Sequence, residues 1–381
     1  MPFEEKNSEI VSSLVCDSCG AKLEFQPGTQ KLRCGYCGTM NEIESGHDYD
    51  TTPAHTISTD FAEFVEAEYN TAQGQKVSSY VVSCKQCGAT TTMLPNVASD
   101  SCPFCTSPLV VNQSDSKQIT QPHVVLPFRI SDRQAALFLF KWMKSRWFVP
   151  NKMLKNADSL VDIRQLKGIY LPYWNFDSNT TTTYTGERGD YYYTTETYTT
   201  TVNGKQEIRT RQVRHTRWSR ASGTVYLYFD KILVKASASI DAKVERKLEP
   251  WRFEDMKAFD ERYLSGFRTE VYKTKPEEGF ETAKQRMDPG IQSAIRDDIG
   301  GDEQRINDYR VTYEDPNIQY AVLPVWISSY KYNNKVYNIY INASTGEVIG
   351  QRPYSFWKIF FFILMILGIL LLFAVIGQAA G

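Results

Sequence analysis

The stretch CDSCG (residues 16–20), followed by CGYCG (34–38), returns 68 residues later as CKQCG (84–88) and CPFCT (102–106). Each copy holds two Cys-x2-Cys pairs, and the two copies use all eight cysteines of the chain. A tetrahedral zinc site needs four soft ligands, which two such pairs on a short β-loop supply. The sequence therefore predicts two zinc ribbons with one Zn²⁺ each, the first ligated by Cys16, Cys19, Cys34 and Cys37 and the second by Cys84, Cys87, Cys102 and Cys105.

Glycine beside the cysteines indicates tight turns that aim both thiolates of a pair at one metal. Gly20, Gly38 and Gly88 directly follow the second cysteine of their pairs, and glycine permits the backbone that such turns require. Pro27-Gly28 marks the turn of a short hairpin between the pairs of the first copy. Four thiolates leave no coordination position for water, so we expect structural and not catalytic sites.

Disulfides and redox dithiols are the alternative uses of paired cysteines. Disulfides form in oxidising compartments, and the N-terminal residues show no signal peptide. A redox dithiol normally comes as one Cys-x2-Cys near a βαβ unit. Iron in the same cage stays open, as does pairing of Cys16 and Cys19 with Cys102 and Cys105, although equal spacers favour pairing within each copy.

The other end of the chain predicts a membrane helix over residues 356–377. Ile359–Ile376 reads IFFFILMILGILLLFAVI and carries no charge, and with the aromatic residues before it the run reaches the length of one bilayer-spanning helix. A buried core helix is the alternative, but the run is apolar on every side. Arg352 and Lys358 lie on its N-terminal side and no charge follows it. The positive-inside rule then places the N-terminal bulk of the chain in the cytoplasm.

Charge is unevenly distributed along the chain. Residues 1–115 contain 6 Lys+Arg and 15 Asp+Glu, a net of −9, whereas the remainder contains 37 and 29, a net of +8. Zinc ribbons that bind nucleic acid neutralise phosphates with Lys and Arg, so the acidic head argues against a nucleic-acid partner. A basic body suits a position beside an anionic cytoplasmic leaflet.

These features predict an α+β fold with two small zinc-ribbon modules, a β-rich antiparallel body with flanking helices, and one C-terminal transmembrane helix. The expected organisation is a first ribbon over residues 1–46, a helical linker over 47–77, a second ribbon over 78–112, a linker over 113–121, the body over 122–355 and the membrane helix over 356–377.

Several elements can be assigned inside these units. A capping pair opens a short helix over residues 60–69, and residues 131–148 form an amphipathic helix that lies on the membrane or, as we prefer, packs on its own domain. Asp288-Pro289 and Gly300-Gly301 frame a further helix. Strands are expected over 169–177, 223–236, 320–332, 335–342 and 346–349, with a turn at Asn333-Asn334. The recurring Leu-Pro at 126–127, 171–172 and 323–324 suggests edge strands.

A Thr- and Tyr-rich hairpin is the strongest strand signal. Residues 180–201 are almost entirely strand formers, and Asn203-Gly204 is a typical hairpin turn. With that turn, facing residues have numbers that sum to 407. The expected pairs are Glu187 with Arg220, Asp190 with Arg217, Tyr193 with Arg214, Glu196 with Arg211 and Tyr198 with Arg209. The arginines then stabilise their own hairpin, and the alternative is a ligand-binding stripe over residues 205–220.

The sequence gives no positive evidence of an enzyme. It has no phosphate-binding loop of the G-x-x-x-x-G-K-[ST] type, no G-x-G-x-x-G after a strand and no G-x-S-x-G elbow. The histidines His47, His55, His123 and His215 are scattered and form no pair. We therefore expect no catalytic residue and no organic cofactor.

The chain resembles bacterial membrane proteins known as TFIIB-type zinc-ribbon-containing proteins. The resemblance rests on the two knuckles at 16–20 and 34–38, the phrase YLPYW at 170–174, GERG at 186–189 and the terminal apolar span. It implies a location in the bacterial inner membrane. Related proteins are similar to partners of phage-shock-protein-A-like membrane-stress proteins, so it also implies a protein partner of that class. Residues 336–350 resemble the closing hairpin of PepSY-type modules.

The leading hypothesis is a membrane-anchored cytosolic zinc-ribbon adaptor that docks a protein partner at the inner face of the membrane, with a role in envelope stress. It expects the acidic ribbons to project from the basic body as a docking surface. The alternatives are a membrane-tethered nucleic-acid-binding regulator and an uncharacterised enzyme in the β-rich body.

Overall fold

The computed structural model describes residues 14–43, 57–69, 76–92, 99–110, 116–151, 166–202, 205–237, 239–332 and 335–379. Within these ranges the fold is mixed α+β, with five α-helices and a β-rich body, as predicted. The expected turns at Asn203-Gly204 and Asn333-Asn334, and the residues His47 and His55, lie outside the described ranges.

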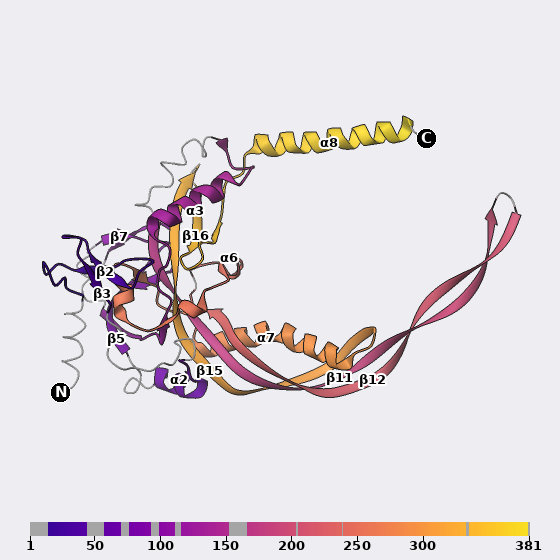
Figure 1. The fold of residues 1–381 in the computed structure, drawn as a ribbon, viewed down its shortest axis with the longest axis horizontal. Coiled ribbons are helices and arrows are strands. Elements are labelled where there is room, and N and C mark those ends of the chain that lie inside the picture. The colour runs from indigo at the N-terminus through magenta and orange to yellow at the C-terminus, as the bar shows by residue number, and fades with distance from the viewer. Residues whose placement is uncertain are drawn as a thin grey trace.

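One nine-stranded sheet forms the body (Figure 1). Its main path runs in the order β12-β11-β15-β10-β13, with the bounds β12 Lys205–Lys235, β11 Leu166–Val202, β15 Glu303–Tyr332, β10 Val124–Val125 and β13 Lys257–Ala258. The strands β4 (Thr59–Asp60), β14 (Arg268–Thr269), β16 (Lys335–Asn342) and β17 (Val348–Gly350) attach to this path.

The central strands of the sheet are buried on both faces. Successive side chains of a strand point to opposite faces, and along β11 Tyr170, Trp174 and Phe176 enter one apolar core while Ile169, Leu171 and Tyr173 enter another. Strand β15 alternates in the same way. The described residues therefore build two cores, one on each face of a single sheet.

Helices and short segments cover the two faces unequally. The helices α2 (Phe61–Tyr69), α3 (Asp132–Lys144) and α7 (Pro276–Ile299) contribute buried residues to the first core, and the 3₁₀ helix η4 (Glu261–Leu264) lies beside them. The second core contains residues from α6 (Ala242–Leu248) and from the segment around the 3₁₀ helix η3 (Phe253–Asp255).

Two of the predicted helices are confirmed. Helix α2 begins after Asp60, whose side chain accepts a hydrogen bond from the Glu63 N–H. Helix α3 begins at a capping box formed by Ser131 and Gln134 and ends at Lys144, a few residues before the predicted end. Its buried residues pack against the body, as we preferred over a position on the membrane surface.

Helix α7 corrects a prediction. Pro276 occupies its first turn, and the helix continues through Pro289, so Asp288-Pro289 does not start a helix. An interior proline costs a helix about 3 kcal/mol. Buried side chains on both sides of Pro289, including Met287 and Ile291, offset this cost because they continue one apolar face along the first core. The predicted end at Gly300 is confirmed.

The long hairpin confirms the predicted register. Strands β11 and β12 pair with residue numbers that sum to 407 from Ser178 to Val202, and all five predicted cross-strand pairs are present. Residues 223–235 are not a separate third strand, because they continue β12 and pair back onto β11. The third strand is β15, which pairs with β11 as far as Gly189.

The side-chain contacts of this hairpin differ in part from the prediction. The Glu196–Arg211 ion pair forms at 3.0 Å. Asp190 instead pairs with Arg188, and Glu187 pairs with Arg305 of β15. The arginines that contact aromatic rings are Arg214 over Tyr191 at 4.2 Å and Arg211 over Tyr198 at 5.7 Å. Register fixes which backbones face each other, but long side chains also reach diagonal neighbours.

None of the Leu-Pro phrases lies in an edge strand: residues 171–172 and 323–324 lie in the central strands β11 and β15, and residues 126–127 directly follow β10, outside any strand. Leu171 faces Leu323 across β11 and β15, and Val125 of β10 faces Val322. Proline is tolerated there because it lies where one ladder stops and the next begins. On one side of β11, residues 169–170 pair with β14, and pairing with β12 starts only at Tyr173. Pro172 therefore lies between the two neighbouring strands.

The predicted linker over 113–121 is also partly wrong. Its described residues form β9 (Ser116–Thr120), which pairs with β5 (Lys76–Ser83) from Tyr80 back to Lys76. The polar residues of this segment suit a strand at the edge of a small sheet, where one face meets solvent.

The C-terminal helix α8 (Phe356–Ala379) leaves the body on its own (Figure 1). Its segment Phe356–Phe373 has a mean hydropathy of 2.6, and 0% of it is buried against the rest of the chain. By length and composition it can span a membrane.

His123 gives the fold a testable pH dependence. Burial lowers its pKa to about 4, and its Nδ1 accepts a hydrogen bond from the Tyr320 N–H at 2.9 Å. The unfolded chain binds this proton near pH 6.5. Between about pH 6.5 and pH 4 the unfolded chain therefore binds a proton at His123 that the folded chain does not bind. The contribution of His123 to the free energy of unfolding is fully present above about pH 6.5 and decreases by roughly 2 kcal/mol as the pH falls toward 4, after allowance for partial exposure. Thermal unfolding of the detergent-solubilised chain across this pH range measures the loss.

The variant His123→Gln is the control for this prediction, because its amide oxygen can accept the same hydrogen bond without titrating. We expect the unfolding temperature of this variant to depend less on pH between about 4 and about 6.5, the two pKa values of the histidine in the folded and unfolded chain. An unchanged pH dependence would show that other groups are responsible.

Candidate metal centres

All four Cys-x2-Cys pairs have the same backbone turn. In each, the N–H of the first cysteine donates to the carbonyl five residues on, and its carbonyl accepts from the N–H four residues on. These hydrogen bonds are 2.8–3.0 Å long and join Cys16 with Ala21 and Gly20, Cys34 with Thr39 and Gly38, Cys84 with Ala89 and Gly88, and Cys102 with Ser107 and Thr106. The sequence repeat is therefore a structural repeat.

The fifth position of each turn has a left-handed backbone. Its φ is +70° at Gly20, +77° at Gly38 and +75° at Gly88, which glycine adopts without a steric penalty. The fourth turn has Thr106 at φ +64°. A β-branched residue in this region is strained by roughly 1–2 kcal/mol. The turn that brings Cys102 and Cys105 together thus holds an unfavourable backbone.

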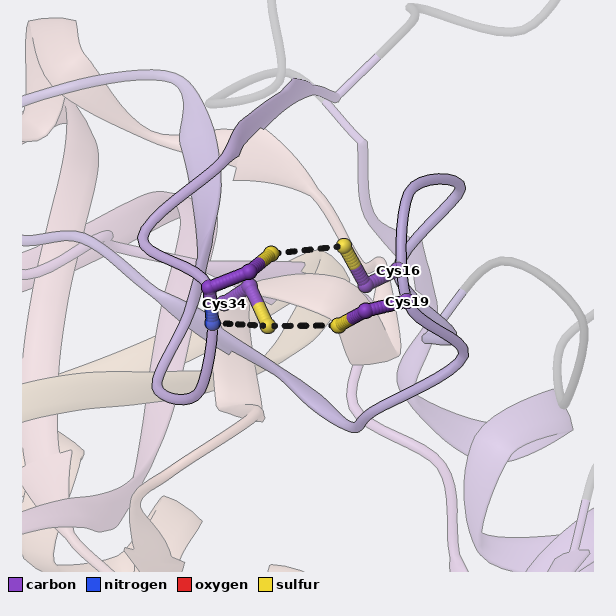
Figure 2. Close-up of side chains that lie close together, drawn as sticks. Cys16, Cys19 and Cys34 are labelled. Atoms are coloured by element: carbon purple, nitrogen blue, oxygen red, sulfur yellow. Dashed lines mark hydrogen bonds between the residues drawn. The ribbon is translucent and has the colours of Figure 1, made fainter.

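The turns bring the sulfurs of each copy into one cluster. In the first cluster (Figure 2), Sγ of Cys16 lies 3.6 Å from Sγ of Cys37, and Sγ of Cys19 lies 3.5 Å from Sγ of Cys34. The second shows the same geometry, with Cys84 and Cys105 at 3.5 Å and Cys87 and Cys102 at 3.6 Å. All four sulfurs of a cluster lie within 4.8 Å of one another.

This geometry fits one four-coordinate ion in each cluster. Four thiolates about 2.3 Å from a tetrahedral ion lie roughly 3.8 Å apart, close to the observed contacts. The clusters form within each copy, so the interleaved pairing of the first and last cysteine pairs is excluded. All eight predicted ligands are in the two clusters.

Local hydrogen bonds favour thiolates at several of these cysteines. The hydroxyl and N–H of Thr39 lower the pKa of Cys37 to about 6, and the Cys37 N–H helps to lower the pKa of Cys34. Burial raises the pKa of Cys105, but the Ser107 hydroxyl and N–H outweigh it and lower the pKa to about 7. Other thiols of the same clusters shift the opposite way, since burial raises the pKa of Cys87 to about 11 and also raises the pKa of Cys102. Because metals bind the thiolate, Cys37 and Cys105 are the thiols best prepared for an ion.

The first ribbon packs on the first core. Its strands β1 (Leu23–Phe25), β2 (Lys31–Cys34) and β3 (Met40–Glu42) form the predicted hairpin and one further strand. The Phe25 N–H donates to the Ser265 carbonyl at 3.0 Å, and the Phe25 ring meets Tyr263 edge-on at 5.3 Å. The ribbon therefore lies against the body, contrary to the expectation of a projecting module.

The second ribbon packs on the opposite face of the sheet. It consists of β5, β6 (Thr90–Thr92), β7 (Ser99–Ser101), β8 (Pro108–Val110) and β9. The Val271 N–H donates to the Thr90 carbonyl at 2.9 Å, and the Thr269 N–H donates to the Thr92 hydroxyl at 3.0 Å. These bonds continue the ribbon into the body beside β14.

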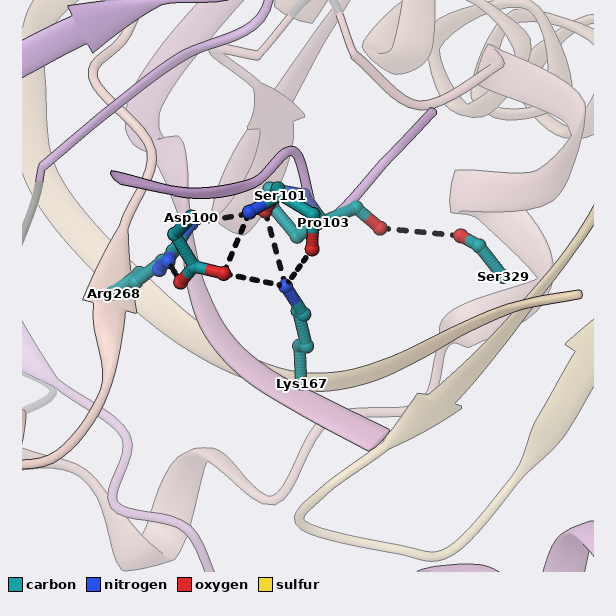
Figure 3. Close-up of polar contacts among 6 residues, drawn as sticks. All are labelled: Asp100, Ser101, Pro103, Lys167, Arg268 and Ser329. Carbon is teal, nitrogen blue, oxygen red and sulfur yellow. Dashed lines mark hydrogen bonds and ion pairs between the residues drawn. The ribbon is translucent and has the colours of Figure 1, made fainter. Parts of the chain in front are cut away.

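A partly buried ion-pair network connects the second ribbon to the body (Figure 3). Asp100 pairs with Arg268, which is only 6% exposed, and with Lys167 at 3.1 Å. Lys167 also donates to the Ser101 carbonyl at 3.0 Å, next to the ligand Cys102. Both cations come from the body, so positive charge lies beside a cluster whose four thiolates are negative.

The second Cys-x2-Cys pair of each ribbon, residues 34–37 and 102–105, is here called its knuckle. The two knuckles differ in exposure to solvent. Tyr36 and Phe104 occupy equivalent positions in CGYC and CPFC. Tyr36 is 86% exposed, whereas Phe104 is 3% exposed in the second core. The Pro103 carbonyl beside Phe104 accepts a hydrogen bond from Ser329 at 3.2 Å. The first ribbon presents its knuckle to solvent, and the second uses its knuckle to pack.

A polar cleft of about 760 Å³ lies where the two ribbons meet the body. It is lined by residues of the first ribbon such as Glu24 and Arg33, by Asp100, and by Arg133 at the start of α3. Asp100 is already paired in the network above. The described histidines lie elsewhere, with His215 stacked on Tyr192 in the long hairpin at 5.3 Å.

The sequence predicted which cysteines cluster but not the body residues that contact the second cluster's ribbon. Lys167, Arg268 and Asp100 are far apart along the chain, and no spacing rule connects them. The strained backbone at Thr106 could have been predicted from the sequence, because Thr106 takes the position at which the other three turns have glycine.

The chain is an α+β protein with two four-cysteine clusters on four equivalent turns and one exposed apolar helix. It is 28% identical over 359 residues to an uncharacterized protein of Bacillus subtilis (strain 168), YdjG, and the match spans 92% of each chain. No family model and no solved structure matches the chain.

The turn geometry predicts unequal effects at two glycines of the first ribbon. No other atom lies within 4 Å of an added Cβ at Gly35 or Gly38, but only Gly38 has a positive φ. We expect Gly38→Ala to lower the local opening free energy of residues 14–43 by about 1 kcal/mol, and the matched Gly35→Ala to leave it unchanged or slightly raised. Hydrogen exchange followed by mass spectrometry measures both values, and equal effects would contradict the assigned turn.

Proposed function

We propose that this chain is a membrane-anchored zinc-ribbon adaptor of the bacterial inner membrane. In this proposal two Zn²⁺ ions hold the ribbons, α8 crosses the bilayer, and the first ribbon docks a protein partner at the cytoplasmic face. The observation that carries the proposal is the difference between the two knuckles: that of the first ribbon is exposed at Tyr36, whereas that of the second is buried at Phe104.

Zinc is supported by the ligand set and the size of the ribbons. Four thiolates in tetrahedral arrangement suit Zn²⁺ or iron, and closed sites of this kind are typically structural zinc. The three short strands of the first ribbon bury few large side chains, among them Leu23, Phe25 and Leu32. A module of this size normally needs a metal to fold.

The anchor is supported by the composition and exposure of α8. Its apolar side chains face outward from the chain, with exposures of 40–68% for Phe360, Phe361, Ile363–Leu367 and Ile369–Phe373. Tyr354 and Trp357 are 60% and 65% exposed at its start, where aromatic residues favour the membrane interface.

Membrane insertion places a demand on the orientation of α8. In Figure 1, α8 and the outer part of the β11–β12 hairpin extend in the same direction. A bilayer crossed by α8 in this orientation would also enclose part of the β11–β12 hairpin, whose strands carry charged side chains, at high cost. We therefore propose that α8 turns relative to the body about residues 352–354 when it inserts, giving up the hydrogen bonds from Lys358 to residues 147 and 149.

The first ribbon offers a suitable docking surface. Tyr36 is 86% exposed, and Met40 and Val15 are 41% and 39% exposed. Exposed aromatic side chains are common anchors of protein interfaces. Asp17 and Glu42 lie exposed on the same ribbon, but Glu42 pairs with Lys31 at 2.8 Å, and residues 14–43 contain three Lys+Arg and three Asp+Glu. The surface therefore suits a partner with an apolar pocket for the Tyr36 ring.

The resemblance drawn from the sequence suggests phage-shock-protein-A-like proteins as the partner class and envelope stress as the setting. The net charge of −9 over residues 1–115 argues against nucleic acid as the ligand of this surface. The absence of enzymatic activity stays a prediction.

Metal removal tests the zinc part of the proposal. We expect two Zn²⁺ per purified chain, one in Cys34→Ser and one in Cys102→Ser, by elemental analysis, because each cluster holds one ion. Because the second ribbon continues into the body, Cys102→Ser should also increase hydrogen exchange at residues 268–271, whereas Cys34→Ser should not. Full zinc content in either variant would contradict the assigned ligands.

A substitution in the exposed knuckle tests the adaptor part. Tyr36→Ser removes an exposed ring and should leave zinc content and stability unchanged. We expect it to reduce, at least about tenfold, the capture of a specific membrane-associated protein after crosslinking in cells, a typical loss for an interface anchor. Tyr80→Ser, at a 45% exposed tyrosine of the second ribbon, is the matched control. Equal capture by all three chains would refute docking through the first ribbon.

A further inference from the structure

The outer part of the long hairpin has a free edge. Residues 190–201 of β11 pair with residues 206–217 of β12, and we call these two segments the distal hairpin. The third strand β15 pairs with β11 only as far as Gly189, and α7 ends at Ile299. Figure 1 shows the distal hairpin extending beyond both. Among the described residues, no strand pairs with the outer edge of residues 190–201.

Its own contacts support the distal hairpin only weakly. Twelve residues of strand span about 40 Å, and an isolated two-stranded hairpin is marginally stable in water. The cross-strand side-chain contacts are at the surface. They are Glu196 with Arg211 at 3.0 Å, Thr194 with His215 at 2.8 Å, Tyr192 stacked on His215 at 5.3 Å, Arg214 over Tyr191 at 4.2 Å and Arg211 over Tyr198 at 5.7 Å. Each contributes roughly 0.2–1 kcal/mol. A third or fourth strand would supply the missing support.

The two edges of the distal hairpin differ in charge. The β12 segment carries Arg209, Arg211, Arg214 and Arg217, and charged side chains are a common means of protecting an edge strand from pairing. The β11 segment has only Asp190 and Glu196 among its twelve residues, and the other ten are Thr or Tyr. These residues favour strands. The β11 edge is therefore the one open to a further strand.

We propose that the β11 edge of the distal hairpin pairs antiparallel with the same edge of a second copy of this chain. The two distal hairpins would then form one four-stranded sheet with two-fold symmetry. This inference rests on neither the metal ions nor the membrane anchor.

The order of residues in β11 fits pairing with itself. With the two-fold axis at Glu196, facing residues have numbers that sum to 392, which places Tyr191 opposite Thr201, Tyr192 opposite Thr200, Tyr193 opposite Thr199 and Tyr198 opposite Thr194. Each tyrosine thus meets a threonine, a favourable cross-strand pair. Like charges meet only at Glu196, which Arg211 already pairs with.

Exposure in the single chain agrees with this arrangement. Tyr192, Tyr193 and Tyr198 are 48%, 61% and 42% exposed, so they are free to cover a neighbouring strand. Pairing through β12 would instead bring two sets of four arginines together, and like charges facing each other destabilise a sheet.

Site-specific photocrosslinking tests the proposed edge. The full-length chain in nanodiscs would carry benzoylphenylalanine at Thr199 of β11 or at Ile208 of β12, which face each other across the hairpin. We expect covalent dimers from position 199 at several times the yield from position 208, with the crosslink mapping near Tyr193. Equal yields from the two positions, or no dimer from either, would overturn the proposal.

A matched pair of charge substitutions provides the second test. Thr197 and Thr210 face each other in the ladder, so Thr197→Lys and Thr210→Lys put the same charge on the same face but beside different edges. We expect Thr197→Lys to weaken dimerisation at least about tenfold by light scattering, because the new lysines repel across the axis. Thr210→Lys should have little effect. A wild-type chain that stays monomeric at all concentrations, or equal effects of the two substitutions, would refute the inference.

Discussion

Strands β11 and β15 bury both of their faces, and this burial determines where the helices and the two ribbons pack. Residues such as Trp174 and Tyr173 are adjacent in sequence and fully buried on opposite sides of one sheet. Each large side chain contributes roughly 1.5–3 kcal/mol when it leaves water, and both faces need a cover. The helices α2, α3 and α7 with the first ribbon cover one face, and α6 with the second ribbon covers the other. The ribbons are therefore parts of the body's cores.

This arrangement gives two similar four-cysteine clusters different surroundings. The second cluster lies beside Lys167 and Arg268, and its Phe104 knuckle fills part of a core. Losing its metal would disturb the sheet edge at β14. The first ribbon buries one side in the body, but its Tyr36 knuckle faces solvent. The same turn therefore holds a buried side chain, Phe104, in the second ribbon and a solvent-exposed side chain, Tyr36, in the first.

Local sequence signals predicted the ligands, the hairpin register, the short helices and the apolar helix α8, because each depends on residues close together in the chain. The failures depend on distant residues. Asp288-Pro289 looked like a helix start because proline is common in the first turn of a helix. The helix instead continues through Pro289, because burial of the apolar face of α7 outweighs the local cost of the proline. Residues 223–235 looked like a new strand, but they continue β12, and the third strand β15 comes from a much later part of the chain. The Asp100 network joins residues more than 60 positions apart.

Whether both clusters are closed zinc centres can be measured by zinc K-edge X-ray absorption on the purified full-length chain, combined with elemental analysis. We expect two Zn²⁺ per chain, each surrounded by four sulfurs at about 2.3 Å. Nitrogen or oxygen in the coordination shell, or fewer than two ions per chain, would contradict the assignment of both four-cysteine clusters as closed metal centres.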